Sequence, residues 1–518
     1  MLFNSIQFFV FFPIIVSLYF LFVYKIRKNW ASQLLLLAAS LFFYACWNPA
    51  YILLILTSVI VTWLSGLLIG KVELSDSKNK ISKKRIILVC SLVLNLLILF
   101  FFKYFNFFSE TVSFIFDRIG VAYRIPAINV LLPVGISFYT FQALGYSIDV
   151  YKGRVAPEKN ILTYALFVTF FPQLVAGPIE RTENLLPQFR VDHEFDYDRV
   201  TDGLKMMAYG MFKKVVVSAQ LAKYVDRVYA DIAGSSGTAV AIATVFFAFQ
   251  ILCDFSGYSD IAIGVAKVLG FNLMQNFERP YFSKSIAEFW RRWHISLSTW
   301  FKDYVYIPLG GSRCSTARRC FNLFVTFLIS GLWHGAAFHF VIWGALHGLY
   351  QVAGVLTKPF RKALLGKAGI ISEDGNTKRW WQFVQVAFTF VLVCFAWIFF
   401  RASTTADSLL AVQKVLQFPK EIIQSVTGLL NGTIGFGEGF FRPYTLGLKK
   451  ITLLSFVLYI TIIIVVSLAT RKKSGCEIVK EKPVLVRWIL YYAVVGVVIY
   501  FMVDAGLFEA TEFIYFQF

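Results

Sequence analysis

The chain has 518 residues, of which 58% are hydrophobic, and this composition is too apolar for a soluble multidomain protein. It predicts an all-α protein that crosses a membrane several times, with membrane lipid around it. The formal net charge is +20, but the basic residues stand between hydrophobic segments, as in the cytoplasmic loops of membrane proteins. We therefore interpret the charge as a topology signal first and as an attraction for an anionic cytoplasmic donor second, and we expect no nucleic-acid partner.

Four membrane spans are predicted in the N-terminal part, at residues 4–23, 31–47, 51–70 and 86–105, because about 20 apolar residues cross a bilayer. Basic residues follow the first apolar run instead of preceding it, which is typical of a transmembrane helix and not of a cleaved signal peptide. The loop 71–85 has six basic residues against two acidic ones and is expected in the cytoplasm. The N-terminus is then expected outside.

Residues 127–270 are less regular, with apolar segments at 128–147, 161–176, 203–222 and 238–256. Backbone broken at membrane depth needs protein or a water-filled cavity around it, so breaks here indicate re-entrant segments around a central funnel. Ordinary kinked helices explain them equally well, and both interpretations stay open. The interrupting residues are Pro133, Gly135, Pro172, Gly177, Pro178, Gly257 and Gly264.

Polar side chains accompany these breaks. Taken singly, each is expected to cap or bridge helices inside the protein. Three of them, Gln142, Gln173 and Asp254, are also candidates for lining the funnel. The full set is Gln142, Asp149, Gln173, Asp254 and Asp260.

Residues 288–348 contain four of the five histidines, His294, His334, His339 and His347. A charged group at membrane depth costs about 2.5–3.5 kcal/mol at a helix centre, so such residues indicate function. A neutral imidazole at His334, among glycines, suits a general base that takes a proton from an acceptor hydroxyl in acyl transfer. His294 is expected to orient that base or to bind the acyl carbonyl. For His339 and His347 we favour hydrogen bonds between helices.

Other kinds of chemistry have no signal in the chain. The histidine spacings suit no common metal site, and the seven cysteines form neither a disulfide framework nor a zinc pattern. No serine stands in a GxSxG motif, and there is no Walker or GxGxxG motif. We therefore expect no bound metal or cofactor, no covalent serine or cysteine nucleophile, and no ATP-driven pump.

A basic segment surrounds and follows His294. It is predicted to face the cytoplasm and to turn at Gly310-Gly311, and its charge suits the phosphates of coenzyme A or the acidic surface of an acyl carrier protein. A topology signal alone would look the same. Its basic residues are Arg291, Arg292, Lys302, Arg313, Arg318 and Arg319, against the acidic Glu288 and Asp303.

The C-terminal part begins with residues 358–379, which are basic and expected in the cytoplasm, before a span at 380–400. Residues 401–450 are predicted outside, with an amphipathic helix at 408–417 on the membrane surface. Two further spans are predicted at 451–470 and 485–503. The tail after Asp504 has Glu509 and Glu512 but no Lys or Arg, which predicts an extracytoplasmic C-terminus.

Six stretches of sequence carry a specific resemblance. In them the chain resembles membrane-bound O-acyltransferases of the bacterial alginate O-acetyltransferase (AlgI-like) branch, over essentially its whole length. Small departures, such as Phe301-Lys302-Asp303 where Leu-Arg-Asp is usual, do not touch His294 or His334. The stretches are LLPVGISFYTFQALGYSIDVY (131–151), FFPQLVAGPIER (170–181), FQILCDFSGYSDIAIG (249–264), NFERPYFSKSIAEFWRRWHISLSTWFKDYVYIPLGG (276–311), SGLWHGAAFHFVIWGALHG (330–348) and FIYFQF (513–518).

The resemblance implies one acyltransferase domain over 1–518, with N-terminal spans at 1–126, a catalytic core at 127–357 and C-terminal spans at 358–518. It implies helices around a central funnel, His334 as the residue essential for catalysis and His294 as the second polar residue of the site. The further candidates for donor binding or funnel lining are Trp333, Trp290, Arg291, Arg292, Lys302, Asp303, Gln142, Gln173 and Asp254.

Members of this family move an acyl group, usually acetyl, from a cytoplasmic thioester to an acceptor beyond the membrane, often through a separate extracytoplasmic acyltransferase. The resemblance therefore predicts O-acetylation of a polysaccharide such as alginate, another exopolysaccharide or peptidoglycan, by a protein of the bacterial inner membrane. Acetyl-CoA or an acylated carrier protein would be the donor. Two alternatives stay open: the D-alanyl transfer branch of the same family, and a transporter without chemistry.

Overall fold

The computed structural model describes residues 1–76, 78–121, 123, 126–128, 131–371, 377–435, 442–504, 506 and 513–516. Throughout these residues the regular structure is helical, and the one β-contact is an isolated bridge between Ile371 and Thr377. The predicted all-α class is confirmed. The chain divides into two compact units: unit 1 comprises Met1–Tyr209, Tyr258–Gln275 and Ala505–Phe518, and unit 2 comprises Gly210–Gly257 and Asn276–Asp504.

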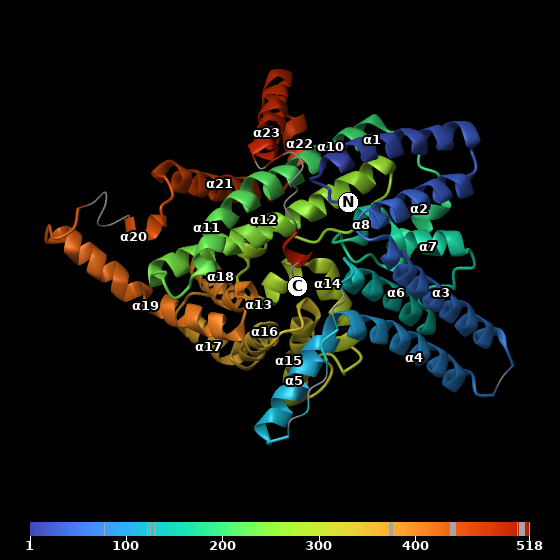
Figure 1. The fold of residues 1–518 in the computed structure, drawn as a ribbon, viewed down its shortest axis with the longest axis horizontal. Coiled ribbons are helices and arrows are strands. Elements are labelled where there is room, and N and C mark those ends of the chain that lie inside the picture. Colours follow the sequence, from blue (N-terminus) through green and yellow to red (C-terminus); the bar gives the residue numbers. More distant parts are fainter. Residues whose placement is uncertain are drawn as a thin grey trace. The chain divides into compact units, whose positions relative to one another are not determined.

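The helices of unit 1 up to α10 are coloured from blue to green in Figure 1. They are α1 (Ile6–Leu21), η1 (Phe22–Ile26), α2 (Asn29–Ala45), η2 (Pro49–Tyr51), α3 (Ile52–Leu74), α4 (Lys80–Leu99), η3 (Phe100–Tyr104), α5 (Phe105–Arg118), α6 (Ile136–Tyr151), α7 (Ile161–Thr169), α8 (Phe171–Leu174), α9 (Thr182–Leu185), η4 (Leu186–Arg190), most of α10 (Tyr197–Met211) and the late turn η9 (Ile514–Phe516).

Unit 2 begins at the end of α10 and includes most of α12, the longest helix described. Its elements are η5 (Phe212–Ser218), α11 (Ala219–Ala230), α12 (Gly237–Leu269), η6 (Pro280–Phe282), α13 (Ile286–Arg292), α14 (Ile295–Phe301), η7 (Lys302–Tyr306), α15 (Thr316–His334), α16 (Phe338–Leu356), α17 (Lys358–Lys367), α18 (Arg379–Arg401), α19 (Thr405–Leu430), α20 (Arg442–Thr445), α21 (Lys450–Ala469), α22 (Gly475–Lys480) and α23 (Val484–Asp504).

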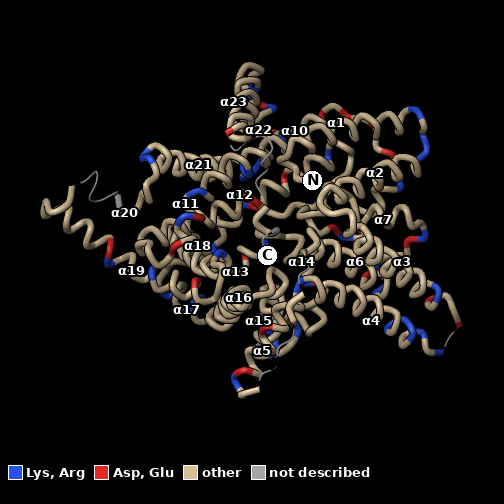
Figure 2. Tube along the Cα trace, in the orientation of Figure 1, with Lys and Arg blue, Asp and Glu red and all other residues tan. Residues whose placement is uncertain are grey.

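Among the residues that the structure describes, eight helical runs are long and apolar enough to cross a membrane, so the chain is a multi-pass membrane protein. Figure 2 shows Lys and Arg gathered near helix ends and connections, with long uncharged stretches between them. This distribution is expected when helix middles lie in hydrocarbon. The eight runs are Ile6–Ile26, Pro49–Leu74, Lys80–Arg118, Gly237–Leu269, Phe338–Leu356, Arg379–Arg401, Lys450–Ala469 and Val484–Asp504.

Most of the predicted spans coincide with these runs. The predictions at 4–23, 51–70, 380–400, 451–470 and 485–503 are each confirmed as one apolar helix, and 86–105 lies inside the continuous run Lys80–Arg118. The segment 31–47 is α2, whose 17 residues are fewer than the about 20 that a span needs. The predicted helix at 408–417 lies within α19. Glu509, Glu512 and the last two residues of FIYFQF lie outside the described residues.

Several predicted breaks are confirmed in unit 1. The segment 128–147 becomes helical only at Ile136, directly after Gly135, whose φ of 74° suits glycine. The segment 161–176 is divided into α7 and α8 at Phe170, which has non-helical dihedral angles. Pro172 lies in the first turn of α8, and the chain is non-helical again at Gly177 and Pro178. Broken helices therefore occur where sequence predicts them in this unit.

The prediction that Gly257 and Gly264 interrupt helices is wrong. Both lie inside α12, which has 33 residues and extends well beyond the predicted 238–256. In unit 2, a Cβ on Gly257 would lie 2.8 Å from the carbonyl oxygen of Gly210; in unit 1, a Cβ on Gly264 would lie 2.6 Å from that of Gly203. Glycine is needed at both positions because the backbone of α10 comes too close for a side chain. The close packing of α12 against α10 offsets the low helix propensity of glycine.

The first turn of α12 is capped by a distant carboxylate. Glu421 of α19 accepts hydrogen bonds from the backbone N–H groups of Gly237 and Thr238 and from the Thr238 hydroxyl, each at 2.8 Å. The first amides of a helix have no acceptor within it, and a negative charge there is also favoured by the helix dipole.

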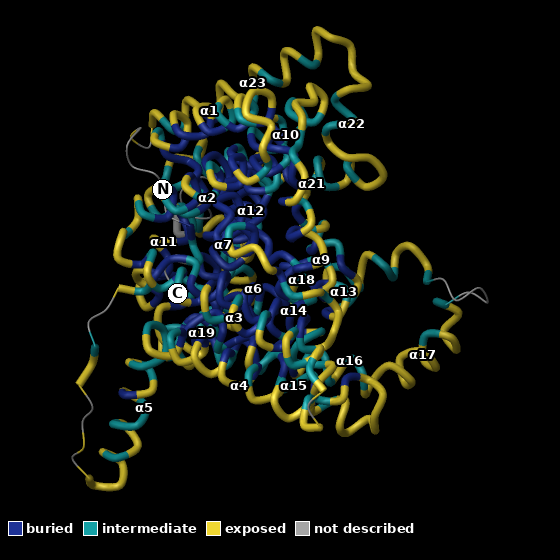
Figure 3. Tube along the Cα trace, turned by 90° about the vertical axis from the view of Figure 1, so that its right-hand side faces the viewer, coloured by how far each residue is buried: buried dark blue, intermediate teal, exposed yellow. Residues whose placement is uncertain are grey.

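α12 is mostly buried, whereas α23 is mostly exposed, as the colours of Figure 3 show.

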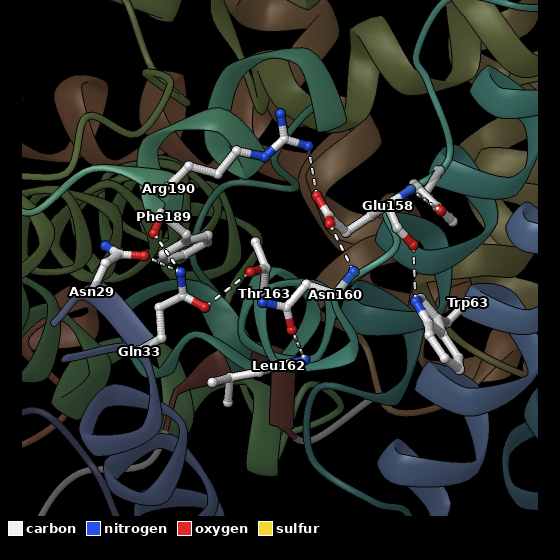
Figure 4. Close-up of polar contacts among 10 residues, drawn as sticks. Asn29, Gln33, Trp63, Glu158, Asn160, Leu162, Thr163, Phe189 and Arg190 are labelled. Carbon is white, nitrogen blue, oxygen red and sulfur yellow. Dashed lines mark hydrogen bonds and ion pairs between the residues drawn. The ribbon is translucent and has the colours of Figure 1, made fainter. Parts of the chain in front are cut away.

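A polar network holds the start of α7 in unit 1 (Figure 4). The side-chain amide of Gln33 donates to the Phe189 carbonyl at 2.8 Å and accepts from the Thr163 hydroxyl at 2.9 Å. The Glu158 carboxylate pairs with Arg190 at 2.6 Å. Hydrogen bonds between helices are favoured where water is absent, so these contacts fix α7 against α2 and η4.

The helices α15 and α16 approach each other closely through glycine. A Cβ on Gly331 would lie 2.4 Å from the Phe340 carbonyl oxygen, and a Cβ on Gly344 would lie 2.4 Å from the Phe327 carbonyl oxygen and 3.0 Å from Gly331 Cα. Gly344 and Gly348 also have the GxxxG spacing that permits such packing between membrane helices. His334 is the last residue of α15, and Trp343 directly precedes Gly344 in α16.

We expect Gly344→Ala to lower the free energy of unfolding by about 1–3 kcal/mol, because its methyl group would overlap the backbone of α15. Gly354→Ala is the matched control, since it lies on α16 too and an added Cβ there meets no atom within 4 Å. Alanine favours a helix over glycine, so the control is expected to be neutral or slightly stabilising. Thermal unfolding of the purified protein measures both, and equal effects would contradict the close packing.

Candidate active site

His334 is the last residue of α15, in unit 2. The following Gly335 has an extended backbone, with φ of −162° and ψ of 150°, and begins the short connection to α16. A Cβ on Gly335 would lie 2.2 Å from the Phe340 ring, so glycine lets that ring pack against the connection. The sequence Trp333-His334-Gly335 thus ends a helix and places the imidazole beside the α15–α16 contact.

Aromatic rings surround the His334 imidazole, which is only 2% exposed. Its ring centroid lies 5.0 Å from Trp333, 4.9 Å from Trp343 and 5.4 Å from Phe400, all edge-on. These residues come from α15, α16 and α18 respectively. The arrangement excludes water from the imidazole and leaves it in a low-dielectric environment.

His294 precedes α14 with a left-handed backbone, φ 44° and ψ 55°, and its side chain is fully buried. A non-glycine residue in this conformation costs about 1–2 kcal/mol, so the surrounding structure must hold it. Asn276 does this: its backbone oxygen accepts from Ile295 N at 2.9 Å, and its Oδ1 accepts from the Ser296 hydroxyl at 2.6 Å. The backbone oxygen and the side-chain oxygen of Asn276 therefore both accept hydrogen bonds that oppose the strain at His294.

The two candidate catalytic histidines contact the same indole. The Trp333 ring lies 6.1 Å from the His294 ring and 5.0 Å from the His334 ring, and His294 also packs edge-on against Phe255 at 4.6 Å. The structure thus places one indole against both His294 and His334, which are forty residues apart in sequence. His294 lies outside the eight apolar runs, and burial lowers its pKa to about 3, so its imidazole is neutral at pH 7.

The other two histidines form contacts between elements, as predicted. His339 Nδ1 lies 2.9 Å from the Phe399 carbonyl oxygen of α18. His347 Nδ1 accepts a hydrogen bond from the Trp290 indole at 3.2 Å, which joins α16 to α13. Trp290, a candidate from the sequence, therefore meets His347 and not His334.

Asp254, another candidate, forms a buried ion pair with Lys214. The Lys214 Nζ and Asp254 Oδ1 atoms lie 2.6 Å apart, and both side chains are at least 95% buried. Nearby, Lys213 donates to the Ser256 hydroxyl at 2.9 Å. Both lysines belong to the π-helical segment η5, so Asp254 joins α12 to η5, as expected for a polar group that bridges helices.

Gln142 and Gln173 lie in unit 1. Their side-chain amides both donate to the carbonyl oxygen of Phe167, at 2.6 and 2.9 Å. Both are buried, and they fasten α6 and α8 to α7. This is the bridging role predicted for each alone, while a role in lining a funnel stays a prediction.

The basic segment is mostly exposed. Arg291, Lys302, Arg313 and Arg319 are exposed, whereas Asp303 is half-buried. Two arginines have fixed partners: Arg292 pairs with Glu288 at 2.7 Å, and Arg318 donates to the Leu309 carbonyl at 3.1 Å. Gly310 and Gly311 have φ of 118° and 58°, which confirms the predicted turn. The segment presents positive charge to its surroundings with little acidic compensation.

Sequence reasoning missed three residues of the site. Asn276 opens the stretch NFERPYF but is distant in sequence from the turn it holds, and Trp343 and Phe400 read as ordinary apolar residues of spans. The signal that could have found Trp343 is its place beside the GxxxG pair at Gly344 and Gly348. Among the described residues, no cluster of three or more His, Cys, Asp or Glu side chains is placed to bind a metal ion.

The ion pair yields a prediction. Lys214→Met leaves the Asp254 carboxylate buried without its cation, and we expect a loss of about 3–5 kcal/mol in the free energy of unfolding. The double variant Lys214→Met/Asp254→Leu removes both charges and should recover most of that loss. Denaturation of the wild type, the single variants Lys214→Met and Asp254→Leu, and the double variant measures the coupling, and additive effects of the two substitutions would show that the pair does not act as a unit.

The sequence model of the membrane-bound O-acyltransferase family matches residues 157–397, which include His294 and His334. The chain is 39% identical over 407 residues to the probable alginate O-acetylase AlgI of Pseudomonas putida, covering 78% of this chain and 77% of that protein. It is 34% identical to the peptidoglycan O-acetyltransferase of Helicobacter pylori, covering 79% and 78%. It is 25% identical to the teichoic acid D-alanyltransferase of Bacillus subtilis, covering 53% and 70%.

Proposed function

Since the chain belongs to the membrane-bound O-acyltransferase family, it is an O-acyltransferase, and we propose that it transfers acetyl from a cytoplasmic thioester to a polysaccharide hydroxyl outside the membrane. The observation that carries this proposal is the buried His334 imidazole, enclosed by Trp333, Trp343 and Phe400. A neutral imidazole in such a site suits proton transfer between an alcohol and a thiolate.

The proposed reaction has His334 as general base. The acceptor hydroxyl attacks the thioester carbonyl carbon, and its proton passes to the imidazole as the new C–O bond forms. The C–S bond then breaks, and the imidazolium returns the proton to the departing thiolate. The products are the O-acetyl ester and the free thiol, and His334 ends as it began. His294, oriented by Asn276, is the second polar residue of the site.

The aromatic enclosure has a chemical purpose in this proposal. Thioesters are hydrolysed when water competes with the alcohol, and a site that excludes water prevents that side reaction. Trp333 contacts both histidines, so it excludes water from the space between their rings. The same burial strengthens each electrostatic contact to the reacting groups.

The donor is proposed to dock on the basic segment from the cytoplasmic side of the bacterial inner membrane. The exposed cations of this segment include Lys302, Arg313 and Arg319, which suit the phosphates of coenzyme A. Acetyl-CoA is therefore the proposed donor, and an acylated carrier protein is the alternative. Both termini are proposed to lie on the extracytoplasmic side of the membrane, as the charges of the loops indicate.

The acceptor is proposed from the relatives that share most of the chain. The names of those at 39% and 34% identity refer to alginate and peptidoglycan, which are both extracytoplasmic polysaccharides bearing hydroxyl groups. We propose an acceptor of this class, reached with the help of a separate extracytoplasmic acyltransferase. The D-alanyl transfer alternative rests on relatives of lower identity that match about half of this chain.

We expect His334→Ala to lower thioester turnover by about 10²- to 10⁴-fold, the usual contribution of a general base. The matched control is His339→Asn, which keeps a side-chain donor near the Phe399 carbonyl and should retain most of the activity. Release of free thiol from labelled acetyl-CoA by protein in nanodiscs measures turnover, with thermal unfolding as the check on folding. A fully active His334→Ala protein would refute the assignment of the base.

Charge reversal tests the donor surface. We expect Arg313→Glu/Arg319→Glu to raise KM for acetyl-CoA several-fold with a smaller change in kcat, because these exposed residues attract the donor and do not contact the reacting bonds. Arg471→Glu/Lys472→Glu is the control of equal charge in another exposed loop. The difference should shrink at high salt. If an acylated carrier protein is consumed and acetyl-CoA is not, the donor assignment is wrong and the D-alanyl branch is favoured.

A further inference from the structure

Two buried N–H groups on α16 have no acceptor among the residues that the structure describes. They belong to the Trp343 indole and to the Nε2 side of the His347 ring, and both side chains are fully buried. Trp343 and His347 are four residues apart on one helix, so they lie on the same face, with ring centroids 4.9 Å apart. A buried donor without an acceptor is unfavourable, and each such group calls for an explanation.

The protonation of His347 follows from its partner. An indole N–H can only donate, so the 3.2 Å contact from Trp290 Nε1 requires His347 Nδ1 to be an acceptor. A neutral imidazole that accepts at Nδ1 has its proton on Nε2. His347 is therefore held in one tautomer and presents Nε2–H as a donor, and it is unsuited to act as a base or a metal ligand through that nitrogen.

One of the two donors, Trp343, adjoins the proposed base, and His347 adjoins Trp343. The centroid of the Trp343 ring lies 4.9 Å from that of His334 and 4.9 Å from that of His347. The close contact at Gly344, the residue after Trp343, holds this part of α16 against α15. An acceptor oxygen bound by the Trp343 indole would lie beside a ring that contacts His334, and His347, on the same face of α16, offers the second donor.

We propose that Trp343 Nε1–H and His347 Nε2–H bind the carbonyl oxygen of the acyl thioester and stabilise the oxyanion that forms on it. This inference rests on the proposed function. When the acceptor hydroxyl attacks, the carbonyl π electrons move to this oxygen, and they return to re-form the C=O bond as the C–S bond breaks. Donors already in place around that oxygen need no reorganisation as its charge develops. Trp290 is a positioning residue that acts through His347.

Kinetics provide the first test. Trp343→Phe removes the indole N–H and keeps an aromatic ring, and we expect kcat for thioester turnover to fall by about 10²- to 10³-fold, with little change in KM. His347→Leu should do the same, whereas His347→Gln, which keeps an N–H near the Nε2 position, should recover much of the loss. Trp290→Phe, which frees the tautomer of His347, should give an intermediate loss. A general-base role for His347 would instead appear as a changed pH profile in His347→Gln.

Infrared spectroscopy of a bound thioester separates this inference from a structural role. In the His334→Ala background, which should bind but not consume the donor, the ¹³C-labelled carbonyl of acetyl-CoA is expected to absorb at lower frequency than in solution. Adding Trp343→Phe or His347→Leu should move it back towards the solution value. An unchanged carbonyl frequency in these folded variants would overturn the inference and assign the two N–H groups to water, while leaving the proposed function intact.

Failure of the proposed function has a different signature. If the wild-type protein neither binds nor consumes any thioester, both the function and this inference are refuted. If wild-type protein consumes acetyl-CoA but Trp343→Phe and His347→Leu are fully active, only the oxyanion assignment is refuted. Thermal unfolding of each variant shows whether a loss of turnover reflects loss of the fold.

Discussion

The close backbone contact between α15 and α16 is the constraint on which the candidate site depends. Gly331 lies one turn before His334, and Gly344 directly follows Trp343, so the two glycines lie close to the residues that meet in the site. Hydrocarbon offers little hydrophobic driving force between helices, and close packing takes its place. A methyl group at either glycine would separate the helices and move the Trp343 ring away from the imidazole.

The two histidines are held by different physical means. His334 is enclosed by aromatic rings from three helices, and its position depends on packing. His294 has a left-handed backbone, and its position depends on hydrogen bonds that Ile295 and Ser296 donate to Asn276. Trp333 contacts both rings and joins the two parts. A substitution that displaces either histidine would therefore change a contact of the same Trp333 ring.

Local sequence pattern was enough to predict the helical class and most apolar spans. It also identified His294 and His334 as candidate catalytic residues. It could not separate glycine that breaks a helix from glycine that packs inside one, because Gly257 looks the same in both cases until its partner Gly210 is known. Nor could it find the role of Asn276, which depends on contacts across about twenty residues of chain. The tautomer of His347 depends on one indole 57 residues away, and no spacing rule contains that information.

The cap on α12 has a consequence for the order of synthesis. Glu421 lies 184 residues after Gly237, so the ribosome must add nearly two hundred residues before the first amides of α12 can meet their acceptor. At 5–20 residues per second that delay is roughly 10 to 40 seconds. During it, the N–H groups of Gly237 and Thr238 lack the Glu421 carboxylate and must donate to water or to another chain, whereas the Ala239 N–H can already donate to the nearby Ser236 hydroxyl. The longest helix described is thus completed late, because a chain that ends before residue 421 lacks the carboxylate that caps its first turn.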